Sequence, residues 1–229
     1  HENGFYSTGK LNIGKDGDFC TSPSLSNDFA RLLAIQVVEW LLDLEKSKID
    51  SELFSIVEIG PGEGTLSRDL IAAIFEIAPA LTSKIELILV ELNVGMRRRQ
   101  EKVVNNLEGI NYRWSNIDDL ISSPVTGVVI ANEVLDAFPV ERLVFCNNNV
   151  FRQGVSLKKI NNEYFLEFID LKPTSKIIKF LQESNSLLKI EFPPKHICNR
   201  WTTEWHCDLP IWFGKLSKVL KHGSLLIID

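Results

Sequence analysis

The stretch from Phe54 to Leu70, "FSIVEIGPGEGTLSRDL", runs an apolar segment into three closely spaced glycines and then into a helical pattern. Its first part, "FSIVEI", is apolar enough to be a strand buried on both faces, and its last part, from Gly64, has apolar residues at helical spacing. Glycine lets the backbone adopt conformations that other residues rarely adopt, so it suits a strand-to-helix turn that approaches a ligand. The stretch therefore predicts a ligand-binding turn at the carboxyl end of a strand.

Apolar strand-like segments alternate with helix-like segments on both sides of this turn. Such alternation predicts βαβ units with right-handed crossovers, and hence an α/β fold with a doubly wound, mostly parallel sheet. The expected strands are "FSIVEIG", "KIELILVE", "INYRW" and "TGVVIANEV", and the helices between them are "GTLSRDLIAAIFEIA" and "VGMRRRQEKVVNNL".

An amphipathic helix is expected before the first strand. Ser22 is placed as its N-cap and Pro23 at its first position. Its apolar face is expected to consist of Phe29, Leu32, Leu33, Val37, Trp40 and Leu41.

The alternation breaks after the fourth strand, between Val140 and Leu171. Asparagine-rich turn signals at 147–149 and 161–162 separate alternating apolar segments, which predicts an antiparallel β insertion. A helix at "SKIIKFLQES", a Trp-rich loop and a last helix follow, and Gly223 is expected to cap that helix at its C-terminus before a final strand.

We expect one domain in four parts, and the absence of an initial methionine and the apolar final strand predict a fragment of a longer, C-terminally incomplete protein. The parts are an N-terminal lid and helix (1–50), a cofactor-binding half (51–139), an inserted substrate-side subdomain (140–208), and the last helix and strand (209–229).

Composition excludes several classes of protein. The 229 residues are 45% hydrophobic with a formal net charge of −5, which indicates a folded chain without the basic surface that nucleic-acid binding requires. No apolar run is long enough to span a bilayer, and no signal-peptide pattern begins the chain. The four cysteines are irregularly spaced, so they predict reduced thiols rather than a disulfide framework.

Two other stretches are given structural interpretations. The basic run 97–102, "RRRQEK", is expected to be a solvated helix face. The spacing of His196, Cys198, His206 and Cys207 fits no zinc pattern, so no metal site is predicted. The neighbouring Trp201, Trp205 and Trp212 are expected to pack in the fold.

The glycine spacing distinguishes between classes of ligand. No lysine follows the glycines as in a P-loop, and Gly60, Gly62 and Gly64 lack the Gly-x-Gly-x-x-Gly spacing of dinucleotide-binding turns. Glu58 in the preceding strand would repel a pyrophosphate but attract a ligand with an amino group and a sulfonium. The turn, which includes Pro61, therefore predicts S-adenosylmethionine, with glycine backbone around its methionine end.

Acidic residues after the second and third strands are candidates for binding the adenosine part. Glu91 ends the second strand, where a carboxylate can accept both ribose hydroxyls, a feature that nucleotide dehydrogenases share. Asp118 or Asp119 follows the third strand, where a carboxylate could receive the adenine amino group. Three alternatives stay open: a glycine turn that serves packing alone, a solvated Glu91, and aspartates that cap a helix.

Several stretches together resemble the MidA family of class I S-adenosylmethionine-dependent methyltransferases. They are "GFYSTG", "GDFCTSP", "VEIGPGEGTL" and "ANEVLDAFPVERLVF", and the resemblance runs from Gly4 to Asp229. It implies a Rossmann-like fold and a relation to mitochondrial members, which methylate an arginine of a respiratory complex I subunit and assist assembly of that complex. The family usually has a basic residue where this chain has Glu63, whose side chain we expect to point outward.

The resemblance also implies roles for individual residues. Glu58 and the three glycines would hold the methionine part of the cofactor, and Glu91 would hold the ribose. The segment 17–23 would form a lid near the cofactor, with contacts from Asp18, Thr21 and Ser22.

The segment after the fourth strand, "NEVLDAFP", supplies the predicted catalytic residues. Open α/β sheets bind substrate at the carboxyl ends of their strands, and a guanidinium pairs bidentately with carboxylates. We therefore expect Glu133 and Asp136 to orient an acceptor guanidinium, with Asn132 helping through its amide. In the alternative interpretation, Asp136 caps a helix and Pro139 ends a turn. Base methyltransferases would show Asn/Asp-Pro-Pro-aromatic here, so nucleic-acid substrates are disfavoured.

The sequence thus predicts a methyltransferase that acts on arginine in a protein substrate, which the inserted segment recognises. The alternatives are a noncatalytic assembly factor that binds S-adenosylmethionine and an NAD-type oxidoreductase. We expect no nucleic-acid partner and no membrane insertion, and the oligomeric state stays open between a monomer and a homodimer. The expected location is the bacterial cytoplasm, or the mitochondrial matrix for a eukaryotic chain.

Overall fold

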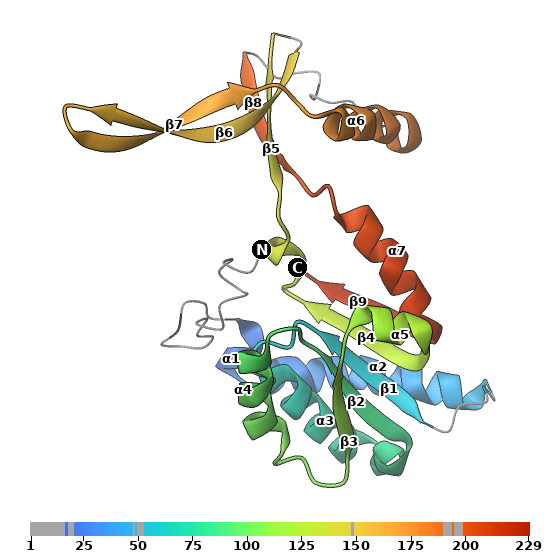
Figure 1. Ribbon diagram of the computed structural model, residues 1–229. Coiled ribbons are helices and arrows are strands. Elements are labelled where there is room, and N and C mark those ends of the chain that lie inside the picture. Colours follow the sequence, from blue (N-terminus) through green and yellow to red (C-terminus); the bar gives the residue numbers. More distant parts are fainter. Residues whose placement is uncertain are drawn as a thin grey trace. The chain divides into compact units, whose positions relative to one another are not determined.

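The computed structural model describes residues 17, 21–47, 49, 53–147, 149–189, 194 and 199–229. The chain divides into two compact units (Figure 1). The first consists of residues 1–137 and 212–229, and the second of residues 138–211. Each unit is described by itself.

A five-stranded parallel sheet forms the centre of the first unit. Its strands are all parallel and follow the order β3-β2-β1-β4-β9. Strands β2 and β3 are added on one side of β1, and β4 and β9 on the other side, so the strand order has its switch point between β1 and β4. Such a switch point is where open α/β sheets bind ligands. The strands are β1 (Phe54–Ile59), β2 (Ile85–Val90), β3 (Asn111–Ser115), β4 (Val125–Asn132) and β9 (Leu220–Ile228).

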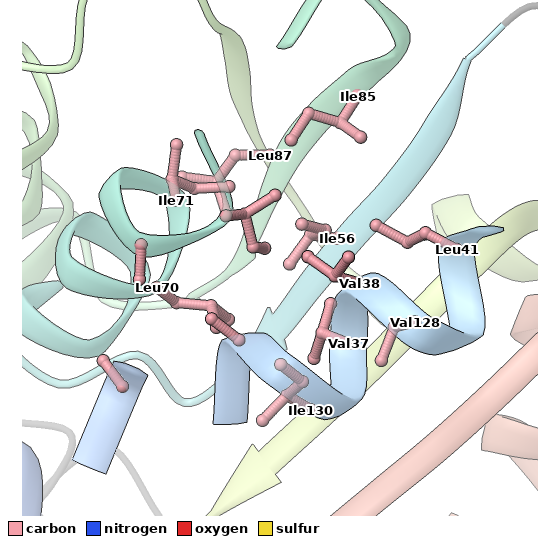
Figure 2. Packing of buried hydrophobic residues seen from close by; sticks show 14 of the residues in the cluster. Val37, Val38, Leu41, Ile56, Leu70, Ile71, Ile85, Leu87, Val128 and Ile130 are labelled. Atoms are coloured by element: carbon pink, nitrogen blue, oxygen red, sulfur yellow. The ribbon is translucent and has the colours of Figure 1, made fainter. Parts of the chain in front are cut away.

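Helices connect these strands, as the alternating pattern predicts. Helices α2 and α3 contact each other, and their apolar side chains join those of β1, β2 and β4 in one buried cluster (Figure 2). The helices are α1 (Ser22–Leu25), α2 (Asp28–Lys46), α3 (Thr65–Ile77), α4 (Val94–Val104), α5 (Ile117–Ser122) and α7 (Leu209–Val219), with 3-10 turns η2 (Pro79–Lys84) and η3 (Leu135–Ala137).

The single helix predicted from Ser22 onward is two helices. The N-cap of α1 is Thr21 rather than Ser22, because the Thr21 N–H donates to the Ser24 hydroxyl at 3.1 Å and the Ser24 N–H to the Thr21 carbonyl at 2.9 Å. The backbone is extended at Ser26, and α2 begins two residues later. Leu32, predicted on the apolar face, is 70% exposed, since the face that packs carries Ala30, Ala34, Val37, Val38 and Leu41.

The C-cap predicted at Gly223 is also wrong. Helix α7 ends at Val219, and Gly223 lies inside β9 opposite Gly127 of β4. Both glycines have positive φ, 137° and 150°, and a Cβ on either would overlap backbone atoms of the neighbouring strand. The pair is glycine because three adjacent strands approach too closely there for a side chain.

The second unit is built on a four-stranded antiparallel sheet in the order β7-β6-β5-β8. This confirms the antiparallel insertion predicted after the fourth strand. Its elements are β5 (Glu141–Cys146), β6 (Asn149–Ile160), β7 (Glu163–Leu171), α6 (Ser175–Leu188) and β8 (Arg200–Trp205).

Local signals explain the elements of this unit. Asn161 and Asn162 both have positive φ, which fits the two-residue turn that joins β6 to β7. The Thr174 hydroxyl accepts from the N–H of Ile177 at 3.3 Å and caps α6. A small core contains Leu143, Phe145, Ile177 and Leu181.

Part of the predicted Trp-rich loop is a strand. Trp201 and Trp205 lie in β8, where Trp201 packs on Phe145 and Trp205 on Phe180. Within the described residues, no cluster of three or more metal-ligating side chains is formed, whereas His196 and Cys198 lie outside those residues. No helix in the described part of the chain is long and apolar enough to cross a membrane.

Candidate functional site

The three glycines form a tight turn between β1 and α3. Gly60, Gly62 and Gly64 have φ values of 63°, 52° and 84°, which favour glycine. The Gly60 N–H donates to the Val90 carbonyl at 3.1 Å, which fixes the start of the turn to the end of β2. A Cβ on Gly60 would lie 3.2 Å from Cγ2 of Val134, so glycine keeps space free where β1 and β4 end.

Glu58 is buried in β1, two residues before the turn. Its carboxylate accepts a hydrogen bond from the hydroxyl of Ser67, which is in the first turn of α3, and a second from the Ser67 backbone N–H. Burial raises the pKa of Glu58 from 4.5 to about 7, while the bonds from Ser67 act in the opposite direction. The carboxylate therefore ties the start of α3 to the central strand, a contact that the sequence interpretation did not include.

Glu91 follows β2 at the same edge of the sheet and is half-buried. One carboxylate oxygen accepts the N–H of Asn93 at 2.7 Å, and the other accepts the side-chain amide of Gln100 at 3.3 Å. The same amide of Gln100 donates to the carbonyl of Gly62 at 2.8 Å. Gln100 thus links the glycine turn with the carboxylate predicted to hold the ribose.

Helix α4 supplies further contacts to the glycine turn. Arg99 forms an ion pair with Glu63 at 3.0 Å, and Arg97 donates to the backbone carbonyl of Glu91 at 2.7 Å. The interpretation of 97–102 as a solvated face is therefore correct for Arg98, Glu101 and Lys102, which are exposed. It is wrong for Arg97 and Arg99, which are partly buried, and for Gln100, which is fully buried. The Glu63 side chain, expected to point outward, is held by this ion pair with Arg99.

The acidic residues after β3 are engaged by protein groups. The Asn116 side chain accepts the backbone N–H of Asp119 at 2.8 Å and donates to its carboxylate at 2.6 Å, so both residues take part in the cap of α5. Asp118 is exposed and pairs with Lys215 of α7 at 2.8 Å. The helix-cap alternative thus describes Asp119, and an adenine contact by either residue stays a prediction.

The predicted lid residues are only partly described. Thr21 and Ser22 form the start of α1, which contacts α2 and α3. Asp18 lies outside the described residues.

The predicted catalytic residues lie at the carboxyl end of β4. Asn132 is the last residue of the strand, Glu133 follows with a φ of 49°, and Asp136 is in the short turn η3. The Glu133 N–H donates to the carbonyl of Ile228 at 2.7 Å, which holds this segment against β9. Asp136 is therefore part of a turn and not the cap of a longer helix.

A third carboxylate belongs to the same edge. Asp229 follows β9, and its side chain accepts the N–H of Leu135 at 2.5 Å. Burial raises the pKa of Glu133, and the charges of Asp136 and Asp229 raise it further. The three carboxyl groups therefore act on one another electrostatically, and a cation with several N–H donors is a suitable partner for such groups.

Gln100 and Asp229 take part in the site although the sequence pattern did not predict them. For Gln100 the sequence contained a usable pattern, because Met96, Gln100 and Val104 are spaced four residues apart and so share one face of a helix. The structure buries all three on this face. A polar residue on the buried face of a helix requires partners. Asp229 had no such signal, since its partner Leu135 is 94 residues away in the sequence.

The carboxyl ends of β1 and β2 suit a cofactor with a cationic methionine end and a ribose. The turn from Gly60 to Gly64 brings backbone close to the switch point, and Glu58 and Glu91 place carboxyl groups at the ends of neighbouring strands. Carboxyl groups beside a glycine turn fit the cationic methionine end and the ribose of S-adenosylmethionine better than they fit a pyrophosphate, which ionised carboxyl groups would repel.

The chain matches, over residues 32–229, the protein family described as "Putative S-adenosyl-L-methionine-dependent methyltransferase". It is also similar to curated proteins named protein arginine methyltransferase NDUFAF7, mitochondrial. The protein of Rattus norvegicus is 37% identical over 83 residues, which are 35% of this chain and 18% of that protein. The protein of Danio rerio is 22% identical over 198 residues, which are 78% of this chain and 46% of that protein.

Two crystal structures from Burkholderia thailandensis are similar to the whole chain. One, of a protein bound to S-adenosyl-homocysteine, has 26% sequence identity and a TM-score of 0.75, with 54% of its chain covered. The other, a native structure of an uncharacterised protein, has 26% identity and a TM-score of 0.71, with 52% covered. This chain thus spans about half the length of these relatives. The similarities confirm the predicted fold class, family resemblance and cofactor.

Proposed function

We propose that this chain, which belongs to the family of S-adenosyl-L-methionine-dependent methyltransferases, transfers a methyl group to an arginine side chain of a protein. The observation that carries the proposal is the set of three carboxyl groups, Glu133, Asp136 and Asp229, at the carboxyl ends of β4 and β9. The names of the NDUFAF7 relatives support it, although this chain spans less than half of those proteins.

The cofactor, when bound, supplies an electrophilic methyl group on a sulfonium. We assign its methionine part to Glu58 and the turn Gly60–Gly64, which includes Pro61, and its ribose to Glu91. The lid residues Asp18, Thr21 and Ser22 and the adenine contact from Asp118 or Asp119 stay predictions.

The carboxyl groups at β4 act on the acceptor. A guanidinium is planar and stays charged at neutral pH, so a pair of carboxylates can hold it in one orientation and place one nitrogen for an in-line attack. We assign this orientation to Glu133 and Asp136, with Asn132 donating or accepting through its amide. Asp229 holds the turn that carries Asp136, because it accepts the N–H of Leu135.

The test measures methyl transfer and cofactor binding separately in the full-length protein. Tritiated S-adenosylmethionine and a cell extract provide the methyl-transfer assay, and mass spectrometry identifies the methylated residue. Glu133→Gln is expected to lower transfer at least about tenfold, since it removes a charge-assisted bond, while calorimetric S-adenosylhomocysteine affinity is unchanged. Glu108→Gln, an exposed carboxylate after α4, is the matched control. Full transfer by Glu133→Gln, or a methylated residue other than arginine, would overturn the proposal.

The second unit is proposed to contact the protein substrate. One face of the β6–β7 hairpin carries exposed apolar side chains, because the antiparallel register pairs Val155 with Phe168 and Leu157 with Leu166. They are Val155, Leu157, Tyr164, Leu166 and Phe168. Since a two-stranded hairpin cannot bury such a face itself, a partner with an apolar surface is the occupant that we propose.

A noncatalytic assembly factor is the alternative function. It would bind S-adenosylhomocysteine with the same residues, but the full-length protein would show no turnover in the extract. The predicted bacterial cytoplasmic location and the homodimer stay predictions, and the eukaryotic relatives are named mitochondrial.

A further inference from the structure

We infer that Gln100 is a positioning residue that fixes the Glu91 carboxylate relative to the glycine turn and so makes the cofactor site selective for a ribose with both hydroxyls. The inference rests on the proposed assignment of Glu91 to the ribose. Gln100 lies in the middle of α4 and has no exposed surface. Burying a side-chain amide costs little free energy only when its polar atoms form hydrogen bonds. Both the nitrogen and the oxygen of the Gln100 amide have partners.

The hydrogen bonds of Gln100 determine which way its amide points. The indole N–H of Trp114 donates to the Gln100 amide oxygen at 2.8 Å, and an indole can only donate. The amide nitrogen therefore faces the other side, where the Gly62 carbonyl and the Glu91 carboxylate accept its two hydrogens at 2.8 and 3.3 Å. Glutamate in this position would set a carboxylate against two acceptors, and a shorter side chain would not span them.

Packing keeps the backbone of Gln100 close to the turn. A Cβ added to Gly64 would lie 3.5 Å from the Cα, Cβ and Cγ atoms of Gln100, so helix α4 is in contact with the turn at this point. Met96 and Val104, one turn before and after Gln100, are buried as well. The amide is thus attached to a helix that cannot shift without disturbing the glycine turn.

These contacts of Gln100 help to fix the orientation of the Glu91 carboxylate. The Asn93 N–H and the Gln100 amide each donate to a different oxygen of this carboxylate. Each oxygen keeps a further lone pair for a ribose hydroxyl. Without Gln100, one oxygen loses its fixed donor, and the carboxylate can rotate away from an orientation that accepts two neighbouring hydroxyls at once.

The experiment compares the calorimetric affinity of the full-length protein for S-adenosylhomocysteine and for its 2′-deoxyribose analogue. A hydroxyl bonded to a carboxylate contributes enough that the wild-type protein should prefer the ribose form about tenfold or more. In Gln100→Met, which keeps the length of the side chain, the preference should fall to about threefold or less. The matched control is Gln36→Met on α2, whose side chain bonds only to Glu39 among the described contacts, and it should keep the wild-type preference.

A merely structural role for Gln100 would weaken both ligands equally and leave their ratio unchanged, which would overturn the inference. Glu91→Ala separates this failure from a failure of the ribose assignment. If Glu91→Ala removes the preference and Gln100→Met keeps it, only the role of Gln100 is wrong. If Glu91→Ala keeps the preference, both are wrong. Should Gln100→Met not fold, Trp114→Phe, which frees the amide to rotate, decides by the same ratio.

Discussion

The two sheets of this chain differ in how far their residues are covered. Strand β1 is buried at all six positions and β4 at seven of eight, whereas β6 and β7 have no buried position and are exposed at six of twelve and seven of nine positions. The first unit therefore derives its stability from apolar area on both faces of the sheet. In the second unit, the β6–β7 hairpin is held by its hydrogen-bonded register and by surface pairs such as Lys158 with Glu167.

The difference in burial between the two sheets matches the different roles proposed for the two units. Of the residues assigned to the cofactor, Glu58 lies on β1, and the glycine turn and Glu91 directly follow the buried strands β1 and β2. Packing of these strands therefore holds their positions, as a precise binding site requires. The hairpin keeps its apolar side chains available, as a surface for a protein partner requires. Substitutions in the two units should accordingly have very different effects on stability.

The largest effect is expected at the glycine pair of the parallel sheet. A Cβ on Gly127 would overlap the carbonyl oxygen of Ser55 in β1, and backbone cannot move aside as a flexible side chain can. Gly127→Ala should cost more than about 4 kcal/mol of unfolding free energy or prevent folding. The measurement is urea denaturation followed by circular dichroism.

Gly214 provides the matched control for this substitution. It is exposed on α7, and nothing lies within 4 Å of an added Cβ. Gly214→Ala should be neutral or stabilise the protein by up to about 1 kcal/mol, because alanine favours helix. Equal urea midpoints for the two variants would show that β1 and β4 do not approach each other as closely as the structure has them.

A smaller effect is expected from truncating leucines of equal size in the two units. Leu87 of β2 is fully buried in the cluster of Figure 2, whereas Leu166 of β7 is 77% exposed. Leu87→Ala should destabilise the protein by about 2–5 kcal/mol, and Leu166→Ala should change the unfolding free energy by less than about 0.5 kcal/mol. A loss above about 1 kcal/mol for Leu166→Ala would contradict the exposure of this face and show that it is covered in the free protein.

The sequence predicted those parts of the fold that local patterns determine. The parallel strands were predictable because they are continuous apolar runs, and the hairpin turn because Asn161 and Asn162 suit positive φ. Gly223 was misplaced because a glycine after a helical pattern usually ends a helix. The close approach of β4 and β9, which is what requires glycine there, connects residues almost a hundred positions apart.

The candidate site was predictable to the same extent. The glycine turn and Glu91 follow their strands directly, so their location depends only on the strand assignment. What each carboxyl group contacts depends on tertiary neighbours. Glu58 is bonded by Ser67 and Glu91 by Gln100, and the residues of each pair are nine positions apart. Even at this short separation, the bonds could not be predicted, because they form only when the strand and the helix pack together.

Glu58 in the first unit and Asp170 in the second unit have carboxyl groups with a shifted pKa, and the two shifts have opposite directions. Burial raises the pKa of Glu58 to about 7, whereas hydrogen bonds from Arg200 lower the pKa of the exposed Asp170 in β7. Between about pH 4.5 and 7 the folded protein holds a proton on Glu58 that the unfolded chain has lost, so this group makes stability fall as the pH rises. The rise of this pKa from 4.5 to about 7 corresponds to a loss of unfolding free energy of up to about 3 kcal/mol, which is complete above pH 7. Asp170 acts the other way, because its contribution is present above its unfolded pKa and is lost as the pH falls through its lowered folded value.

Urea denaturation without cofactor at pH 5 and pH 8 separates the two groups. Glu58→Gln cannot ionise and keeps an amide in place of the acid, so its stability should fall less than that of the wild-type protein between these pH values. Asp170→Asn should leave this difference unchanged, since Asp170 is ionised in both states throughout the range. An equal loss of stability in the wild type and in Glu58→Gln would mean that the carboxyl group of Glu58 is hydrated, and that packing around β1 is less complete than the comparison of the two sheets requires.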